Sequence, residues 1–211
     1  MRMRNEDYSR RAIRIRDIAP DFRLEDAWLL PVHGGPDDLG TLVGVMATLD
    51  PANGDSLASH FLFDVRHRIG DRLGWDTERS LPIPEDTEIS LRARLPNDLR
   101  DTVADLNFST SPFTPLYRTA TEFAAELSNR TVHAVMHLVW MEREDGHYQG
   151  GLGVYVKPRG GLGAGYMTAI APFRRSIVYP ALLRQISQAW NARGDASKPA
   201  ERQPPAEPLS L

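Results

Sequence analysis

Residues 131–142 constrain the fold of this chain more than any other segment. Their side chains alternate between two faces, and both faces are largely apolar. One face carries Val132, Ala134, Met136, Leu138 and Trp140, and the other carries His133, Val135, His137, Val139 and Met141. An antiparallel strand with one face in water should instead alternate between apolar and polar residues. We therefore expect a strand covered on both sides, by a C-terminal helix on one side and by other elements or a second subunit on the other.

The neighbouring segments predict an antiparallel meander around this strand. Asp145-Gly146 is a strong hairpin signal between it and the next predicted strand, 148–156. Consecutive strands joined by short turns favour antiparallel pairing. Further strands are predicted at 11–16, 27–32, 88–95, 113–118 (interrupted by Pro115), 121–127 and 163–170.

Two helices are predicted. Apolar residues recur every four positions over 56–73, which is typical of an amphipathic helix. The closing helix spans 172–193, and Pro180 should divide it, because an interior proline removes a backbone hydrogen bond and clashes with the preceding turn. The proline-rich segment 195–211 is predicted to be a disordered tail. A single α+β domain over 1–194 follows.

Composition excludes several classes of function. Lys and Arg number 25 against 28 Asp and Glu, so the net charge of -3 provides no field that attracts nucleic acid. The chain contains no cysteine, which excludes disulfides and thiolate chemistry and is compatible with a reducing compartment. No stretch of about 18 apolar residues occurs, so we expect no insertion into a membrane and a cytoplasmic location.

The glycines of 148–156 raise the question of a cavity above the sheet. If the hairpin loop has two or four residues, Trp140 pairs with Gly151 and Leu138 with Gly153, which leaves room above the sheet. A three-residue loop places His137 opposite Gly153 instead. The glycines are equally consistent with a bulge or bend in a strongly curved sheet.

Three stretches of sequence carry a resemblance to a known family. They are 63–75, 125–133 and 171–182, the last reading Ala-Pro-Phe-Arg-Arg-Ser-Ile-Val-Tyr-Pro-Ala-Leu, and Tyr166 belongs with them. Together they resemble the uncharacterised bacterial family catalogued as domain of unknown function 2867. The resemblance covers most of the chain except the first predicted strand and the tail.

The resemblance implies a fold similar to the START and Bet v 1 group. In that helix-grip fold a curved antiparallel sheet grips a long C-terminal helix, and the space between them often holds a lipid, sterol or polyketide-like molecule. The resemblance implies no reaction. Some relatives carry this domain behind a reductase-like nucleotide-binding domain, but this chain has no Gly-x-Gly-x-x-Gly after a strand, so no nicotinamide cofactor and no other cofactor is predicted.

A ligand cavity between the sheet and the helix would be lined by large apolar and aromatic residues. The same residues are equally suited to fill an ordinary core, and the volume of the interior separates the two interpretations. The candidate lining residues are Met136, Leu138, Trp140, Tyr155, Tyr166, Phe173 and Ile177.

Paired titratable residues offer little catalytic signal. His133 and His137 share a strand face but lie about 13 Å apart, too far to bind one metal ion directly, so no metal site is predicted. Glu122 and Glu126 are separated by the same distance, beyond that of a glycosidase pair. If Glu126 pointed into a dry cavity near His133, its pKa would rise and it could act as a general acid or base.

Two basic or flexible motifs have plain interpretations. Residues 160–165 are rich in glycine but are predicted to form a hairpin turn rather than a phosphate loop, since another strand is expected after them. Arg174 and Arg175 would lie in the first turn of the closing helix, where the helix dipole disfavours cations. Acidic neighbours, or the anionic head group of a ligand, should compensate them.

The sequence leaves three functions open. The first is a non-enzymatic carrier or sensor of a hydrophobic small molecule held between sheet and helix. The second is an enzyme of the cyclase or hydrolase type that uses His133 or Glu126 with Tyr117 or Tyr155, provided that these side chains converge. The third is an interaction module that forms a homodimer through the second apolar face of the sheet.

Overall fold

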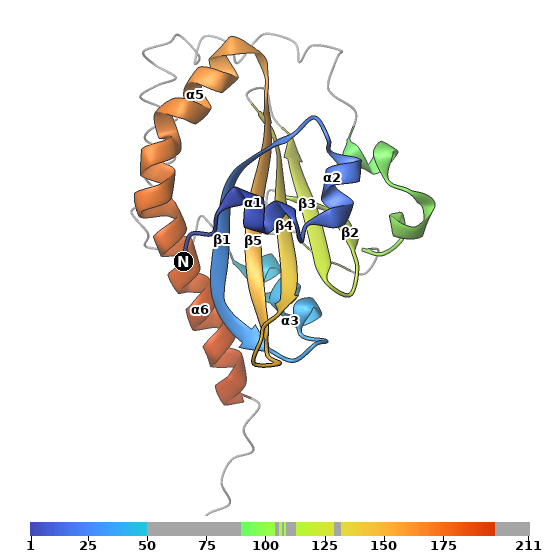
Figure 1. Ribbon diagram of the computed structural model, residues 1–211, viewed down its shortest axis with the longest axis vertical. Helices are drawn as coiled ribbons and strands as arrows, with labels where there is room; N and C mark the ends of the chain where they lie inside the picture. Colours follow the sequence, from blue (N-terminus) through green and yellow to red (C-terminus); the bar gives the residue numbers. More distant parts are fainter. Residues whose placement is uncertain (50–89, 104–105, 107, 109–112, 129–131, 197–211) are drawn as a thin grey trace, which may run out of the picture.

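The protein is an α+β domain built on one curved, unclosed antiparallel sheet (Figure 1). The computed structural model describes residues 1–49, 90–103, 106, 108, 113–128 and 132–196. The strand order is β1-β5-β4-β3-β2, so the last four strands form the predicted meander and β1 joins it beside β5. The strands are β1 Arg23–Gly34, β2 Thr114–Arg118, β3 Glu122–Ser128, β4 Val132–Glu142 and β5 Tyr148–Pro158.

The register of β4 and β5 is the one expected for a hairpin loop with an odd number of residues, rather than for a loop of two or four. His137 pairs with Gly153, Trp140 pairs with Gly150, and Arg143 donates its backbone N–H to the carbonyl of His147 at 2.8 Å. Gly146 has φ 79°, the left-handed conformation that a tight turn at this point requires. The pairing of Trp140 with Gly151, expected for a loop of two or four residues, does not form, and the alternative with His137 opposite Gly153 is present. Trp140 lies opposite Gly150 instead.

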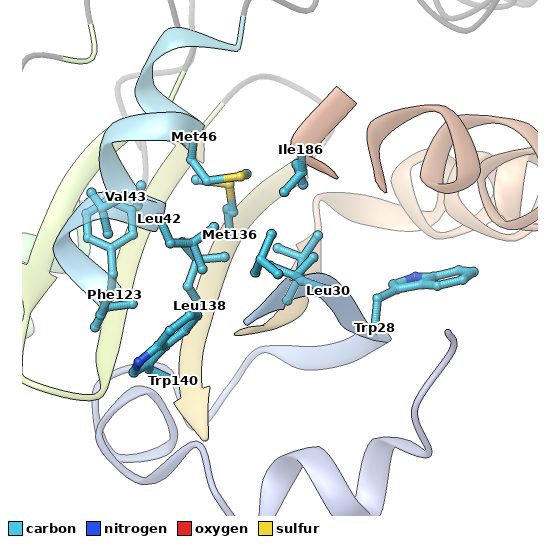
Figure 2. Packing of buried hydrophobic residues seen from close by; sticks show 14 of the residues in the cluster. Trp28, Leu30, Leu42, Val43, Met46, Phe123, Met136, Leu138, Trp140 and Ile186 are labelled. Atoms are coloured by element: carbon cyan, nitrogen blue, oxygen red, sulfur yellow. The ribbon is translucent and has the colours of Figure 1, made fainter. Parts of the chain in front are cut away.

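Both faces of the sheet are covered by the chain itself, as the pattern of β4 predicts. On one face α3 (Leu39–Thr48) and α6 (Tyr179–Ala196) enclose an apolar layer that we call the helix-side core (Figure 2). On the other face α1 (Asn5–Ser9), α2 (Ile13–Ile18) and two short 3-10 helices, Leu91–Arg94 and Asn97–Leu99, enclose the N-terminal-side core. Figure 1 shows α1 and α2 lying in front of the strands. The second face, for which the sequence left other elements or a second subunit as cover, is thus covered by elements of the same chain.

Two predicted strands near the N-terminal-side core are short helices instead. Residues 13–16 of the 11–16 segment belong to α2, and Ala12 is its N-cap. The buried residues Ala12, Ile15 and Ile18 recur every three positions. The 88–95 segment contains the 3-10 helix Leu91–Arg94, which begins where the Ser90 hydroxyl accepts a hydrogen bond from the backbone of Arg92. In both segments the alternation of apolar and charged residues is short enough to fit either a strand or a helical turn. Contacts with the sheet then determine which of the two forms.

The C-terminal helix is longer than predicted and is interrupted as predicted. It begins as α5 (Gly160–Phe173), continues as a π-helix at Arg174–Val178 and ends as α6. Pro180 lacks an N–H and cannot complete a regular turn with Ser176, so the wider π turn precedes it. Figure 1 shows one long, bent helix on the β1 side of the sheet.

The start of α5 corrects two predictions. The glycine-rich 160–165 segment is the first turn and a half of a helix rather than a hairpin turn, and 163–170 is helical rather than extended. Met167 and Ile170 are buried three positions apart against the end of the sheet, a spacing that a strand does not give. The predicted helix over 56–73 and residues 197–211 of the predicted tail lie outside the described residues.

Within the described part of the chain, none of the helices combines the length and the apolar character needed to cross a bilayer.

Candidate functional site

A cluster of polar side chains lies in the N-terminal-side core, between the sheet and α1. We call it the polar cluster and define it as Tyr8, Tyr117, Glu122, His137 and Tyr155. Its members come from α1, β2, β3, β4 and β5 respectively, and every one of them is buried. Five elements therefore meet at one group of titratable residues.

Hydrogen bonds connect four members of the polar cluster in a chain. His137 Nε2 lies 3.1 Å from Glu122 Oε2, and the Tyr117 hydroxyl donates to the same oxygen at 3.1 Å. A carboxylate only accepts, so Nε2 carries a proton and Nδ1 of the neutral imidazole is an acceptor. The Tyr8 hydroxyl lies 2.8 Å from this Nδ1 and 2.9 Å from the backbone carbonyl oxygen of His137, and its proton can go to either.

Burial sets the protonation of the polar cluster. It lowers the pKa of His137, and the Glu122 carboxylate opposes this effect only in part, so the imidazole is neutral at neutral pH. Burial also raises the pKa of Tyr155 to about 12 and holds that of Tyr8 well above its ordinary value, with Tyr155 and Tyr117 adding to the latter. The arrangement is that of a general base: a carboxylate orients a histidine, and the histidine faces a hydroxyl.

A second histidine and glutamate pair lies beside the first on the same face. His133 Nε2 is 2.8 Å from Glu126 Oε2, which also accepts the backbone N–H of Leu91 at 3.0 Å, while Oε1 accepts from the Ser90 hydroxyl. Burial alone would raise the pKa of Glu126, but these donors together lower it below its ordinary value. Glu126 thus lies near His133 as considered from the sequence, but as a stabilised carboxylate that holds the 3-10 helix rather than as an acid with a raised pKa.

The residues of the enzyme hypothesis lie on the same face of the sheet, in the N-terminal-side core, but they are not paired as expected. It paired His133 or Glu126 with Tyr117 or Tyr155. The structure brings Tyr117 to Glu122 and places the Tyr155 ring 6.1 Å from that of His137. Sequence reasoning missed Tyr8 altogether, because nothing in its local pattern indicates a contact with a residue 129 positions away.

Two glycines of β5 form the floor on which Tyr8 rests. A Cβ on Gly153 would lie 2.4 Å from Tyr8 Cε1, and one on Gly151 would lie 3.4 Å from Tyr8 Cε2. The space above these glycines, which the sequence suggested as room for a ligand, is filled by the Tyr8 ring over Gly153 and by Val139, Met141 and the edge of the Tyr8 ring over Gly151. On the opposite face a Cβ on Gly150 would lie 3.0 Å from Leu42 Cδ2 of α3, so that space is filled as well.

An ion-pair cluster ties the C-terminal helix to β1. Asp26 is fully buried, and its two oxygens accept from Arg174 Nε at 2.8 Å and Arg175 Nε at 2.7 Å. Glu25 lies 3.7 Å from Arg174 Nη2. The arginines begin the π-helix rather than the first turn of the helix, and acidic neighbours compensate them. Of the two explanations considered from the sequence, the acidic one is present.

The candidate lining residues do not face one common space. Met136, Leu138 and Trp140 lie in the helix-side core with Ile186 of α6 (Figure 2). Tyr155 lies on the other face of the sheet, Phe173 is half-buried, and Ile177 is 41% exposed. The backbone of Tyr166 lies in α5. Of the six candidates whose side-chain burial the structure describes, three share the helix-side core.

Trp28 is a residue of the helix-side core that sequence reasoning missed. It is 8% exposed, its ring lies 5.0 Å from that of Tyr179, and no described residue accepts a hydrogen bond from its indole N–H. Trp140, in the same layer, donates its indole N–H to the carbonyl of Gly35 at 2.8 Å. The strand pattern of β1 buries Trp28, but whether its N–H finds an acceptor depends on packing that the sequence does not show.

Among the described residues, no three His, Cys, Asp or Glu side chains lie together in a way that would hold a metal ion.

Comparison with family models assigns the chain to a family. Residues 18–181 match the family described as "Protein of unknown function (DUF2867)". The chain belongs to this family. The match includes the Trp28 environment, both ion-paired arginines and four members of the polar cluster, and residues 1–17, with Tyr8, lie outside it. Searches of the curated proteins and of the solved structures found no match to the chain.

Membership of the DUF2867 family supplies no reaction, ligand or partner. The sheet that grips a C-terminal helix is the helix-grip arrangement expected from the sequence. Placement of the family in the START and Bet v 1 group stays a prediction.

Proposed function

We propose that this DUF2867 protein binds an apolar small molecule with one hydrogen-bond acceptor, in the helix-side core beside Trp28. The observation that carries the proposal is the buried indole N–H of Trp28, for which the described chain offers no acceptor. The large majority of buried side-chain polar atoms in proteins have a partner, and leaving one without costs about 1–3 kcal/mol. A carbonyl, carboxyl or hydroxyl oxygen of a ligand would remove this cost.

The surroundings of Trp28 suit such a ligand. The helix-side core is apolar and contains the flexible side chains Met46 and Met136, which adapt to irregular shapes. Polar groups gather at one end of it, where Tyr179 packs against Trp28 and interacts with the ion pair of Asp26 with Arg174. Sites for small molecules are typically apolar with a few placed polar groups.

The helix over Trp28 is irregular at this point. Tyr179, which contacts Trp28, is the first residue of α6 after the π-helix Arg174–Val178. Single π turns within α-helices occur frequently at functional sites. We place this binding activity in the cytoplasm, since the chain contains no cysteine.

Native mass spectrometry of the freshly purified full chain tests the proposal. We expect a species heavier than the chain by the mass of one small molecule, which organic extraction removes and which can then be identified. A spectrum with the bare chain alone, under conditions that keep other protein and ligand complexes intact, would contradict the proposal.

Two tryptophan variants test the position of the ligand. Trp28→Phe should lower the fraction of ligand-bound chain at least several-fold, because it removes the donor that the ligand needs. Trp140→Phe is the matched control, since it removes an indole from the same layer whose N–H is already bonded to Gly35. Equal retention of the ligand by both variants would place the ligand elsewhere.

A further inference from the structure

We propose that His137 and Glu122 form a binding site for the hydroxyl of a phenolic small molecule, that the Tyr8 side chain occupies this site as an internal ligand, and that the phenol enters when α1 leaves the sheet. This site lies on the opposite face of the sheet from Trp28 and does not rest on the function proposed above.

The contacts of Tyr8 are those that a bound phenol would make. Its hydroxyl meets an acceptor nitrogen and a carbonyl oxygen of His137, at 2.8 Å and 2.9 Å. Its ring lies directly over Gly153, where a Cβ would be 2.4 Å from Tyr8 Cε1, so that a flat aromatic ring fits against the backbone of β5. The side chain is fully buried. Shape and hydrogen bonding therefore both specify a phenol.

The site formed by His137 and Glu122 has polar groups that can hydrogen-bond a hydroxyl, in addition to apolar contacts for a ring. Glu122 fixes the tautomer of His137, so Nδ1 is an acceptor aimed at the phenol oxygen. Tyr155 adds a donor: it is 4% exposed, its ring lies 6.1 Å from that of His137, and none of the described residues pairs with its hydroxyl. A ligand with a second oxygen atom would satisfy this hydroxyl, which Tyr8 does not.

The α1 segment that carries Tyr8 and the strands that carry His137 and Glu122 differ in their relation to the rest of the domain. His137 and Glu122 lie on the central strands and inside the segment that matches the DUF2867 family, whereas Tyr8 lies outside it. The α1 helix has five residues, too few to be stable alone.

Apart from Tyr8, residues 1–5 are tied to β1 at the edge of the sheet. Met1 and Leu29 exchange two hydrogen bonds, at 2.7 Å and 3.1 Å, Met3 N–H donates to the carbonyl of Ala27 at 2.9 Å, and Asn5 Nδ2 donates to that of Leu24 at 2.7 Å. Arg2 lies 3.9 Å from Asp26. Within α1 itself, only Asn5 and Tyr8 make these side-chain hydrogen bonds to the sheet.

Binding of p-cresol, which is the side chain of tyrosine, to the full-length Tyr8→Ala variant tests the proposal. Titration calorimetry should show that this variant binds p-cresol at least about tenfold more tightly than toluene, because a site built to hydrogen-bond a hydroxyl discriminates against its absence. Ile15→Ala is the matched control: it opens a cavity in the same core at a fully buried apolar residue and should show no such preference. Equal affinity of Tyr8→Ala for p-cresol and toluene would overturn the proposal.

Hydrogen exchange in the unaltered protein tests whether p-cresol displaces Tyr8 from the site, even if Tyr8→Ala fails to fold. Saturating p-cresol should accelerate exchange of the backbone amides of residues 7–12 several-fold, since it competes with Tyr8, while toluene at the same activity should not. Unchanged or slower exchange of these amides in p-cresol would show that α1 is a permanent part of the fold and would overturn the proposal.

Discussion

The two faces of the central sheet are filled by different chemistry, although the alternation of β4 makes both look apolar. The helix-side core holds Leu, Met and Trp side chains between the sheet and two helices. The N-terminal-side core holds, among apolar residues, two histidine and glutamate pairs and three tyrosines. Apolar packing tolerates exchange of one shape for another, whereas a buried polar network depends on every member. The faces should therefore respond differently to equally small changes.

The largest difference is expected between neighbours on β3 and β4. Glu122→Leu removes the acceptor of both His137 and Tyr117 and should lower the free energy of unfolding by about 3 kcal/mol or more, since two buried donors lose their partner. Leu138→Met, fully buried on the other face, should cost less than about 1.5 kcal/mol. Urea unfolding measures both, and similar losses would show that the faces are energetically alike.

The glycines of β5 give a second comparison. Gly153→Ala places a methyl group 2.4 Å from the rigid Tyr8 ring and should cost about 2–3 kcal/mol, as Tyr8 is forced off the sheet. Gly150→Ala meets Val32 Cγ2 at 2.9 Å and Leu42 Cδ2 at 3.0 Å, ends of side chains that can shift, and should cost about 1 kcal/mol. The same denaturation measurement applies, and a reversed order would mean that α1 adapts more easily than α3.

The pH dependence of stability should come from the N-terminal-side core. Burial lowers the pKa of folded His137, so below about pH 6.5 the unfolded chain takes up a proton that the folded chain refuses, and stability falls as pH falls. One such group contributes at most about 1.4 kcal/mol per pH unit. The lowered pKa of Glu126 adds a further loss below about pH 4.5.

Chemical denaturation from pH 8 to about pH 2.5 measures these two steps. Glu126→Gln should flatten the lower step and leave the loss between pH 7 and pH 5 in place. A free energy of unfolding that stays constant between pH 7 and pH 5 would contradict a buried neutral His137.

The smallest expected difference lies within the helix-side core. In the chain freed of ligand, Trp140→Phe should cost about 1 kcal/mol more than Trp28→Phe, because only Trp140 loses a hydrogen bond. The carbonyl of Gly35 then keeps only the longer bond from the backbone N–H of Asp38, at 3.4 Å. Thermal unfolding of the two variants side by side checks this. Equal losses would indicate that Trp28 has an acceptor in solution.

The sequence predicts the regular part of the sheet well and the contacts between distant residues poorly. Strands β2 to β5 follow from alternation and from the Asp145-Gly146 turn, because these signals are local. The pairing of Trp140 required the length of that turn, which alternation does not determine, and the alternative with His137 opposite Gly153 is the one present. Segments 11–16 and 163–170 are too short or too rich in glycine for alternation to separate strand from helix.

The polar cluster shows the same limit at the level of the site. The sequence pairs His133 with His137 on one face of their strand, and Glu122 with Glu126 on one face of theirs. In the structure each histidine instead binds a glutamate on the adjacent strand. Tyr8 carries no local signal of its contact with His137, and the strand pattern that buries Trp28 does not show whether its N–H finds an acceptor. Their roles depend on which residues the finished sheet brings near them, and alternation along one strand contains no such information.

The position of β1 at the edge beside β5 has a consequence for the order of folding. The hairpin of β4 and β5 forms from residues close in sequence, whereas β1 and the Tyr8 ring need a partner strand that ends at Pro158. Loops that long close slowly because of their entropy. Residues 1–34 leave the ribosome ahead of their partners and must wait for them, so the part of the chain that is synthesised earlier is among the last to reach its native contacts.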